Sequence, residues 1–180
     1  MFRRTIMENN WYMLTVIGKD RPGIVAGITT ELYKEGCYLG EASMIRLGGD
    51  FTIMMMVQYD GNEQALENCL NPVAHKMSLH LHLDKIKGKL HDHRTPDVSI
   101  TVYGADKSGI VAKVATELSG AGLDIFNLES IVGGSKEKPI YIMQMEGHAD
   151  KGIDILKQKI EKLTSKEIEV HLEIIDTMLG

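Results

Sequence analysis

Residues 15–36 read TVIGKDRPGIVAGITTELYKEG, and the same pattern returns at residues 101–122 as TVYGADKSGIVAKVATELSGAG. The two stretches align without a gap, and 12 of the 22 positions are identical. A period of 86 residues is too long for a solenoid repeat and matches the size of a small domain. The 180-residue chain is therefore expected to hold two copies of one domain, at residues 8–90 and 97–178, separated by a polar stretch that contains a proline.

A strand followed by a helix opens the first copy. Residues 12–17 form an apolar, β-prone run that is followed by Gly18, and this pattern predicts a strand. Asp20 is expected to cap the helix, with Pro22 in the first turn, where proline is tolerated. Apolar side chains then recur at helical spacing and are expected to face the core: Ile24, Val25, Ile28 and Leu32.

Three more strands and a second helix complete the first copy. The sequence predicts strands at residues 37–47 and 51–59, joined by a tight Gly-Gly-Asp turn. A helix is expected from residue 62 to about residue 70, where the Asn71-Pro72 pair interrupts or ends it. Leucines that alternate with polar residues over 79–84 predict the fourth strand.

The second copy repeats this order of elements. Strands are expected at residues 98–103, 123–132, 139–145 and 168–174, and helices with their apolar faces at Ile110, Val114, Leu118, Ile153, Leu156, Ile160 and Leu163. The order β-α-β-β-α-β, twice, is that of the split βαβ unit. The fold class is therefore α+β, with two ferredoxin-like domains whose antiparallel sheets carry both helices on one face.

The third strand of the first copy is apolar at every position from Ile53 to Val57, with three methionines between them. A strand buried on both faces has this pattern. The helix-free face of the first domain is thus expected to be covered by the sister domain or by a second chain, which predicts a homo-oligomer. The alternative is that some of these methionines are exposed.

Composition excludes several classes of protein. The net charge of -5 and the pI of about 5.8 disfavour direct nucleic-acid binding, which needs a basic surface. No apolar run is long enough to span a membrane, and no secretory signal is expected at the first residues. Cys37 and Cys69 are expected to be free thiols in the cytoplasm. The histidines are expected on solvated faces, and no catalytic, metal or cofactor motif is found.

The turn before the first helix of each copy is the candidate ligand site. A helix N-terminus offers unpaired N–H groups and a positive dipole end to a carboxylate. Gly23 and Gly109 have no side chain, so a ligand could approach the backbone closely. In the second copy, Asp124 begins a strand that is expected to run beside the first strand. Asp106 and Asp124 could then hold an ammonium group together.

The loops at residues 18–25, GKDRPGIV, and 104–111, GADKSGIV, resemble the signature loop of ACT domains, which are βαββαβ regulatory modules. The resemblance extends over nearly the whole chain. A chain of two such domains is similar to the glycine cleavage system transcriptional repressor group. The loop also resembles modules of formyltetrahydrofolate deformylases and of nitrogen-regulating uridylyltransferases.

The resemblance implies specific ligand-binding residues. In amino-acid-binding ACT domains, asparagines of the loop and of the second strand hold the effector, and the matching residues are Asp20 and Tyr38, and Asp106 and Asp124. With their neighbours, the candidates are Asp20, Arg21, Pro22, Gly23, Ile24, Tyr38 and Leu39 in the first copy, and Asp106, Lys107, Ser108, Gly109, Ile110, Asp124 and Ile125 in the second. Tyr38 departs most from the pattern, so Asp106→Ala is expected to reduce binding more than Asp20→Ala. The alternative is that Asp20 and Asp106 only cap their helices.

The resemblance also implies a function. It predicts a non-enzymatic regulator that binds an amino acid such as glycine and acts on a protein partner, plausibly a transcription factor, without contacting DNA or a membrane itself. Three alternatives are an interaction module without a ligand, an enzyme of amino-acid, one-carbon or nitrogen metabolism or its detached regulatory subunit, and a repressor that binds DNA directly.

Overall fold

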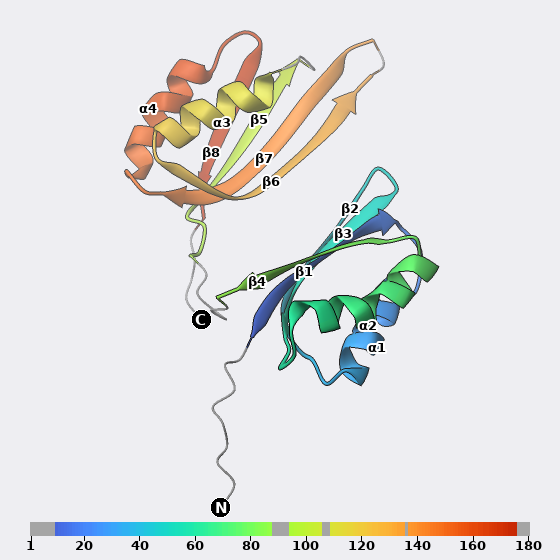
Figure 1. Cartoon of the computed structure of the whole chain (residues 1–180). Coiled ribbons are helices and arrows are strands. Elements are labelled where there is room, and N and C mark those ends of the chain that lie inside the picture. Colours follow the sequence, from blue (N-terminus) through green and yellow to red (C-terminus); the bar gives the residue numbers. More distant parts are fainter. Residues whose placement is uncertain (1–9, 88–93, 106–108, 136, 176–180) are drawn as a thin grey trace, which may run out of the picture. The chain divides into compact units, whose positions relative to one another are not determined.

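The structure is a computed structural model that describes residues 10–87, 94–105, 109–135 and 137–175 (Figure 1). The chain divides into two compact units, residues 1–92 and residues 93–180. None of the helices in the described ranges is long and apolar enough to cross a membrane.

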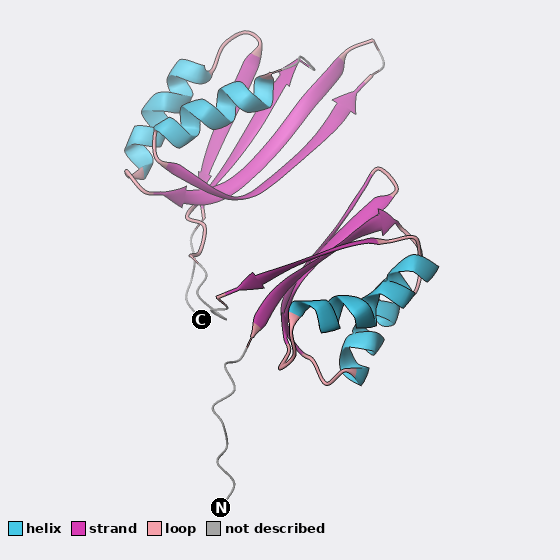
Figure 2. Ribbon diagram, in the orientation of Figure 1, coloured by secondary structure: helices cyan, strands magenta, loops and turns pink. Residues whose placement is uncertain are grey.

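Unit 1 is a four-stranded antiparallel sheet with two helices on one face (Figure 2). Its elements are β1 (Trp11–Lys19), α1 (Ile24–Lys34), β2 (Tyr38–Leu47), β3 (Asp50–Gln58), α2 (Glu63–Lys76) and β4 (His80–Ile86). The strand order is β2-β3-β1-β4, so β1 and β3 are central and β2 lies at an edge.

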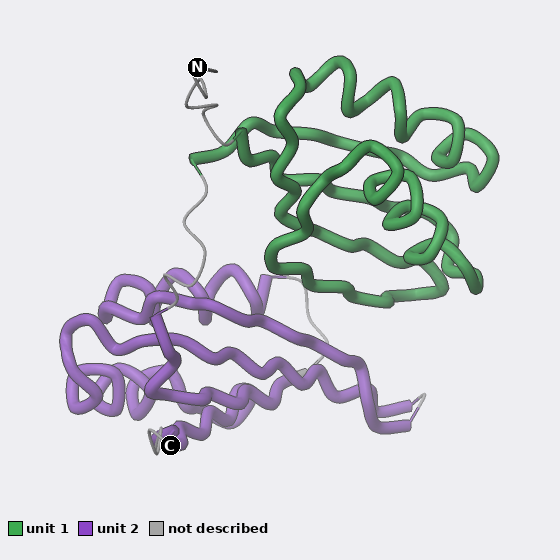
Figure 3. The backbone as a smooth tube through the Cα atoms, turned by 90° about the horizontal axis from the view of Figure 1, so that it is seen from below, with its two compact units in different colours: residues 1–92 green, residues 93–180 purple. Residues whose placement is uncertain are grey.

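Unit 2 has the same architecture (Figure 3). Its elements are β5 (Val98–Ala105), α3 (Ile110–Gly120), β6 (Leu123–Gly134), β7 (Pro139–Ala149), α4 (Ile153–Leu163) and β8 (Ile168–Ile174). The strand order β6-β7-β5-β8 matches that of unit 1. The α+β prediction of two ferredoxin-like domains is therefore confirmed.

The core of each unit lies between the sheet and its two helices. The spacing of four in the first helix of each copy is confirmed, because α1 buries Ile24, Ile28 and Leu32 and α3 buries Ile110, Val114 and Leu118. Alternate residues of the central strands supply the other side of each core. Each unit thus buries one face of its sheet by the same pattern.

The second helix of unit 1 is longer than the sequence predicted. It continues through Pro72 to Lys76, so the expectation that Asn71-Pro72 interrupts or ends it is wrong. Pro72 lies on the exposed side, where the carbonyl that loses its hydrogen bond can turn to water. The buried side chains continue across it at a spacing of four, as Leu66, Leu70 and Ala74. Their burial favours the longer helix.

The methionines of β3 divide between the two faces of the sheet. Met55 belongs to the core, while Met54 and Met56 alternate with it and face away from the helices. The side chain of Met54 is 47% exposed. The covering of this face by the sister domain or by a second chain stays a prediction.

Candidate ligand-binding site

A glycine with a left-handed backbone conformation precedes the first helix of each unit. Gly23 is the N-cap of α1 with φ of 91°, and Gly109 is the N-cap of α3 with φ of 88°, a region that glycine adopts without the cost of a Cβ. In the described parts of the chain, no side chain caps either helix. The expectation that Asp20 caps its helix is therefore wrong. Asp106 itself, with Lys107 and Ser108, lies outside the described residues.

Asp20 forms an ion pair with Arg46 near the end of β2. The register explains the pairing, because Arg46 lies opposite Phe51 on β3, and Phe51 lies opposite Gly18 on β1. The backbone N–H of Asp20 also donates to the carbonyl of Gly49 at 3.1 Å, which ties the loop to the β2-β3 turn. The Asp20 side chain is 26% exposed and that of Arg46 is 68% exposed. The pair is thus fixed by the fold but remains open to solutes.

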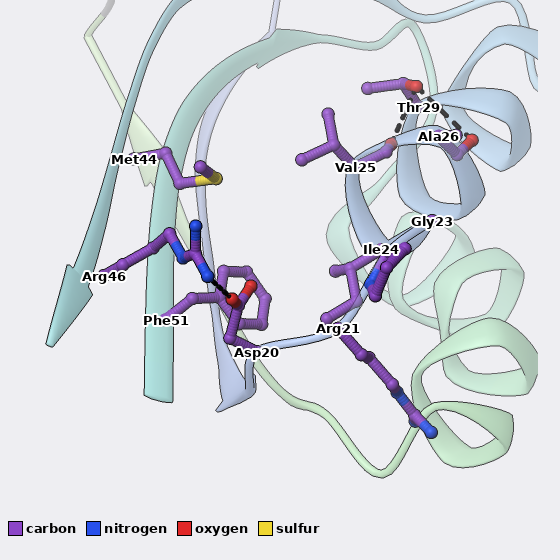
Figure 4. A pocket seen from close by; sticks show the side chains of 11 residues that line it. Asp20, Arg21, Gly23, Ile24, Val25, Ala26, Thr29, Met44, Arg46 and Phe51 are labelled. Atoms are coloured by element: carbon purple, nitrogen blue, oxygen red, sulfur yellow. Dashed lines mark hydrogen bonds and ion pairs between the residues drawn. The ribbon is translucent and has the colours of Figure 1, made fainter. Parts of the chain in front are cut away.

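A cavity of about 630 Å³ opens beside this ion pair, between β2 and the start of α1 (Figure 4). It is lined by Asp20, Arg21, Pro22, Gly23, Ile24, Val25, Ala26, Thr29, Met44, Arg46 and Phe51. Figure 4 shows Asp20, Arg46 and Met44 on one side of the cavity and Val25 across from them, while the Arg21 side chain points away from the ion pair. The cavity therefore has a charged part and an apolar part.

The apolar part of the cavity combines buried and exposed side chains. Phe51 and Ile24 are each 3% exposed, whereas Met44 is 48% and Val25 is 43% exposed. Val25 was expected to widen the core stripe of α1, and this prediction is wrong, because its side chain lines the cavity instead. A ligand that covered Met44 and Val25 would gain hydrophobic contact.

The start of α1 adds a positive electrostatic end to the cavity. Ile24, Val25 and Ala26 line the cavity and form the first turn of α1, so their N–H groups have no acceptor within the helix. The hydroxyl of Thr29 donates to the carbonyl of Val25 at 2.8 Å. The cavity therefore brings a guanidinium, a carboxylate and a helix N-terminus to an apolar wall, an arrangement suited to a zwitterion.

Comparison with known proteins identifies the module that carries this cavity. A model of the ACT domain matches residues 12–84, which contain the loop, the ion pair and the cavity. A UPF0237 protein from Listeria monocytogenes is 30% identical over 84 residues, which are 44% of this chain and 94% of that protein. The chain belongs to the ACT domain family.

Three further likenesses concern a curated repressor and two solved structures. The glycine cleavage system transcriptional repressor of Escherichia coli is 33% identical over 58 residues, so the match spans 32% of this chain and only 30% of that repressor. A solved structure of a candidate glycine cleavage system transcriptional repressor has a TM-score of 0.69 at 19% identity, over 93% of this chain and 98% of that chain. A protein of unknown function from Galdieria sulphuraria has a TM-score of 0.66 at 21% identity, over 93% and 99%. These two structures share the fold of the chain.

The second-strand residues of the first ACT unit do not join the cavity. Tyr38 and Leu39 begin β2, and Tyr38 lies opposite Gln58, at the end of the sheet far from Asp20. The strand order explains this, because β2 runs parallel to β1 with β3 between them. The Tyr38 ring meets the ring of Trp11 edge-on at 6.2 Å. Asp20 and Tyr38 of one unit are therefore not brought together.

In the second ACT unit, Asp124 is likewise remote from the helix start. The expectation that its strand runs beside the first strand is wrong, since β7 separates β6 from β5. Asp124 and Ile125 pair with His148 and Gly147, near the start of β5, whereas Gly109 and Ile110 follow the end of β5. Asp124 therefore lies at the opposite end of the sheet from the start of α3.

Asp124 is also engaged by a residue of its own unit. The Arg94 guanidinium donates to Asp124 at 3.2 Å and to Asp150 at 2.7 Å. The hydrogen bond and charge of Asp150, with the charge of Asp124, raise the pKa of Arg94 further above its ordinary value. An effector at Asp124 would have to compete with this cation.

Sequence reasoning missed Met44, Arg46 and Phe51. These residues come from β2 and β3, which no motif links to the loop. One signal was present, because Met44 and Arg46 fall on the same face of the strand, and their counterparts 86 residues later are Ser130 and Val132. Arg46 is a charged residue on the helix-facing side of its strand, and the second copy has Val132 at this position. This difference indicates that Arg46 serves a site in the first copy.

Proposed function

We propose that this protein is a non-enzymatic regulator whose first ACT unit binds a small zwitterionic effector, an amino acid, in the cavity beside Asp20 and Arg46. The observation that supports this most is the meeting of an open Asp20–Arg46 ion pair with an uncapped helix start over an apolar wall. An amino acid carries one carboxylate and one ammonium on a single carbon. It can offer an acceptor to Arg46 and a donor to Asp20 at once.

Effector binding acts on the rest of the protein through the elements that line the cavity. The loop, α1 and the edge strand β2 all contribute to its wall. A ligand shifts a conformational equilibrium only if it binds one arrangement better than another. Contacts to both β2 and α1 would favour the arrangement that holds them at the observed separation. A partner that recognises the exposed edge of β2 would then sense the effector.

The partner in this proposal is a protein, plausibly a transcription factor of amino-acid metabolism. The likeness of 58 residues to the glycine cleavage repressor of Escherichia coli supports that choice. The net charge of -5 disfavours direct contact with nucleic acid, because phosphate neutralisation would need a basic surface. Glycine is the effector that this likeness implies.

A second candidate function is an interaction module that needs no ligand. Apolar side chains on the helix-free face of unit 1 favour it, among them Ile17 at 48%, Met54 at 47% and Ile45 at 58% exposure. A contiguous patch of this kind is typical of a surface that binds another protein. A detached regulatory subunit of an enzyme would use the same surface.

A thermal-melt screen of the full chain separates the two functions. The twenty amino acids are tested singly in large excess. A ligand at about 100 times its dissociation constant stabilises the folded state by about 2.7 kcal/mol, which shifts the melting temperature by several degrees. A shift with one or a few amino acids is the expected result. Unchanged melting with all twenty contradicts effector binding and favours the interaction module.

A further inference from the structure

We propose that the effector of the first ACT unit is an α-amino acid with a bulky apolar side chain, of the size of leucine or methionine, rather than glycine. This inference rests on the proposed function, because it names the class of amino acid that the same cavity would take. Three features carry it: the size of the cavity, its charged pair of Asp20 and Arg46, and the apolar chemistry of its far wall.

The cavity is much larger than glycine. Its volume is about 630 Å³, within the usual range of sites for drug-sized ligands, about 300–1,000 Å³. One water molecule has a share of about 30 Å³ in the liquid, so a glycine of five heavy atoms would occupy on the order of 150 Å³. The cavity therefore has room for a side chain beyond the backbone groups of an amino acid. A larger side chain would fill that room.

The charged part of the cavity selects for both ends of an amino acid. Arg46 and Asp20 pair with each other when no ligand is bound. A carboxylate that takes Arg46 leaves Asp20 without its cation, unless the same molecule brings an ammonium. A zwitterion replaces one ion pair by two, whereas a simple carboxylic acid or a simple amine leaves one charge unpaired. The Asp20–Arg46 pair therefore favours an α-amino acid over a simple carboxylic acid or a simple amine.

The far wall selects for an apolar side chain. Val25 and Met44 are half-exposed there, and Phe51 and Ile24 form the buried floor. The hydroxyl of Thr29 donates to the backbone of its own helix, so its proton does not reach toward a polar side chain of the ligand. Figure 4 shows Arg21 pointing away. Each methylene buried here adds about fourfold to affinity.

The same reasoning predicts one such site per chain. The counterparts of Met44 and Arg46 on β6 are Ser130 and Val132. Neither can supply the guanidinium, and serine removes the thioether from the apolar wall. Unit 2 therefore lacks the residues of β2 that define the ligand class.

Isothermal titration calorimetry on the full chain tests the class directly. The probes are glycine, alanine, leucine, methionine and 4-methylpentanoate, which is leucine without its amino group. We expect leucine or methionine to bind about tenfold or more tighter than glycine, with one site per chain. We expect 4-methylpentanoate to bind about tenfold weaker than leucine.

Matched variants locate the site. Arg46→Gln should weaken leucine binding about tenfold or more, whereas Lys19→Gln should leave it unchanged. Lys19 makes the neighbouring ion pair with Asp50 at 2.9 Å but does not line the cavity, and both variants remove one positive charge. Thermal melts of the ligand-free variants check that each is folded.

The outcomes distinguish a failure of the inference from a failure of the proposed function. Glycine binding as tightly as leucine, with Arg46→Gln weakening both, overturns the apolar class and leaves the proposed function standing. Leucine binding that is indifferent to Arg46→Gln overturns the assigned site and with it the inference. No binding by any of the four amino acids overturns the inference, and a silent screen of all twenty removes the proposed function as well.

Discussion

The edge strands β2 and β6 carry different side chains at matching places. Met44 and Arg46 of unit 1 correspond to Ser130 and Val132 of unit 2, and the register of each sheet confirms the alignment. In unit 1 both side chains line a cavity, and Arg46 forms an ion pair with Asp20 of the loop. The two copies therefore share a fold, but only unit 1 places a methionine and a guanidinium on this part of the wall.

At the starts of β2 and β6 it is unit 2 that carries the charged contact. Tyr38 meets Trp11 edge-on in unit 1, whereas Asp124, its counterpart, pairs with Arg94 in unit 2. An aromatic contact in one unit thus stands where an ionic contact stands in the other. The units diverge at edges and loops, where change costs little, and keep their cores.

The largest effect is expected where the units agree. Leu32 and Leu118 occupy matching positions in α1 and α3, and each is 0% exposed. Leu32→Ala and Leu118→Ala should each lower the free energy of unfolding of their own unit by about 2–5 kcal/mol, through lost burial and a cavity. Urea denaturation followed by circular dichroism measures this, with Tyr33→Ala, at an 81% exposed position, as the control. If only one of the two leucine variants lost stability, the two cores would not be equivalent.

The next effect concerns the two loops. Asp20→Ala is expected to weaken leucine binding about tenfold, because it removes the carboxylate of the charged pair, and Asp106→Ala should change it little. Calorimetry measures both affinities. The sequence alone favoured the opposite ranking. A larger loss with Asp106→Ala would restore it and would move the site to the second unit.

The third effect concerns the helix-free faces. Met54 and Met56 of β3 match Gln144 and Glu146 of β7, so the face of unit 1 is more apolar. Light scattering at micromolar concentration should detect a dimer or larger assembly of the wild-type chain. The double variant Met54→Gln, Met56→Glu, which gives unit 1 the side chains of unit 2, should shift it toward monomer. A monomeric wild-type chain would count against the covered face.

Much of the fold follows from local pattern. The repeat gave the two copies, and the spacing of Ile24, Ile28 and Leu32 correctly identified the buried face of α1. The end of α2 was missed, because the rule that proline breaks a helix takes no account of burial on the other side of Pro72. Local propensity is weaker than packing in such a case.

The candidate site was predicted only in part. The loop at Asp20 was identified from its sequence, but its capping role was wrong, and its partner Arg46 lies 26 residues away on an edge strand. Linking them requires the strand register, which brings the end of β2 beside the end of β1 through β3. For the same reason, Tyr38 and Asp124 were grouped with loops that lie at the far ends of their sheets.

The smallest effect concerns one glutamate at matching places in the two units. Glu31 pairs with Lys34 of its own helix at 2.8 Å, whereas Glu117 pairs with Lys159, which joins α3 to α4. The hydrogen bond and charge of Lys159 lower the pKa of Glu117 below its ordinary value.

A carboxyl group whose pKa is lowered by folding stabilises the folded state above its ordinary pKa, and this stabilisation is lost as the pH falls through the lowered value. Glu117→Gln should therefore lower the melting temperature slightly at pH 7 and much less near pH 3. Glu31→Gln is the matched control, since it removes a pair within a single helix, which is typically worth about 0.2–0.5 kcal/mol. Both pairs are partly exposed, so salt should weaken both effects. If Glu117→Gln lowered the melting temperature equally at both pH values, the lost stability would come from packing, and the contrast between the two glutamates would not be electrostatic.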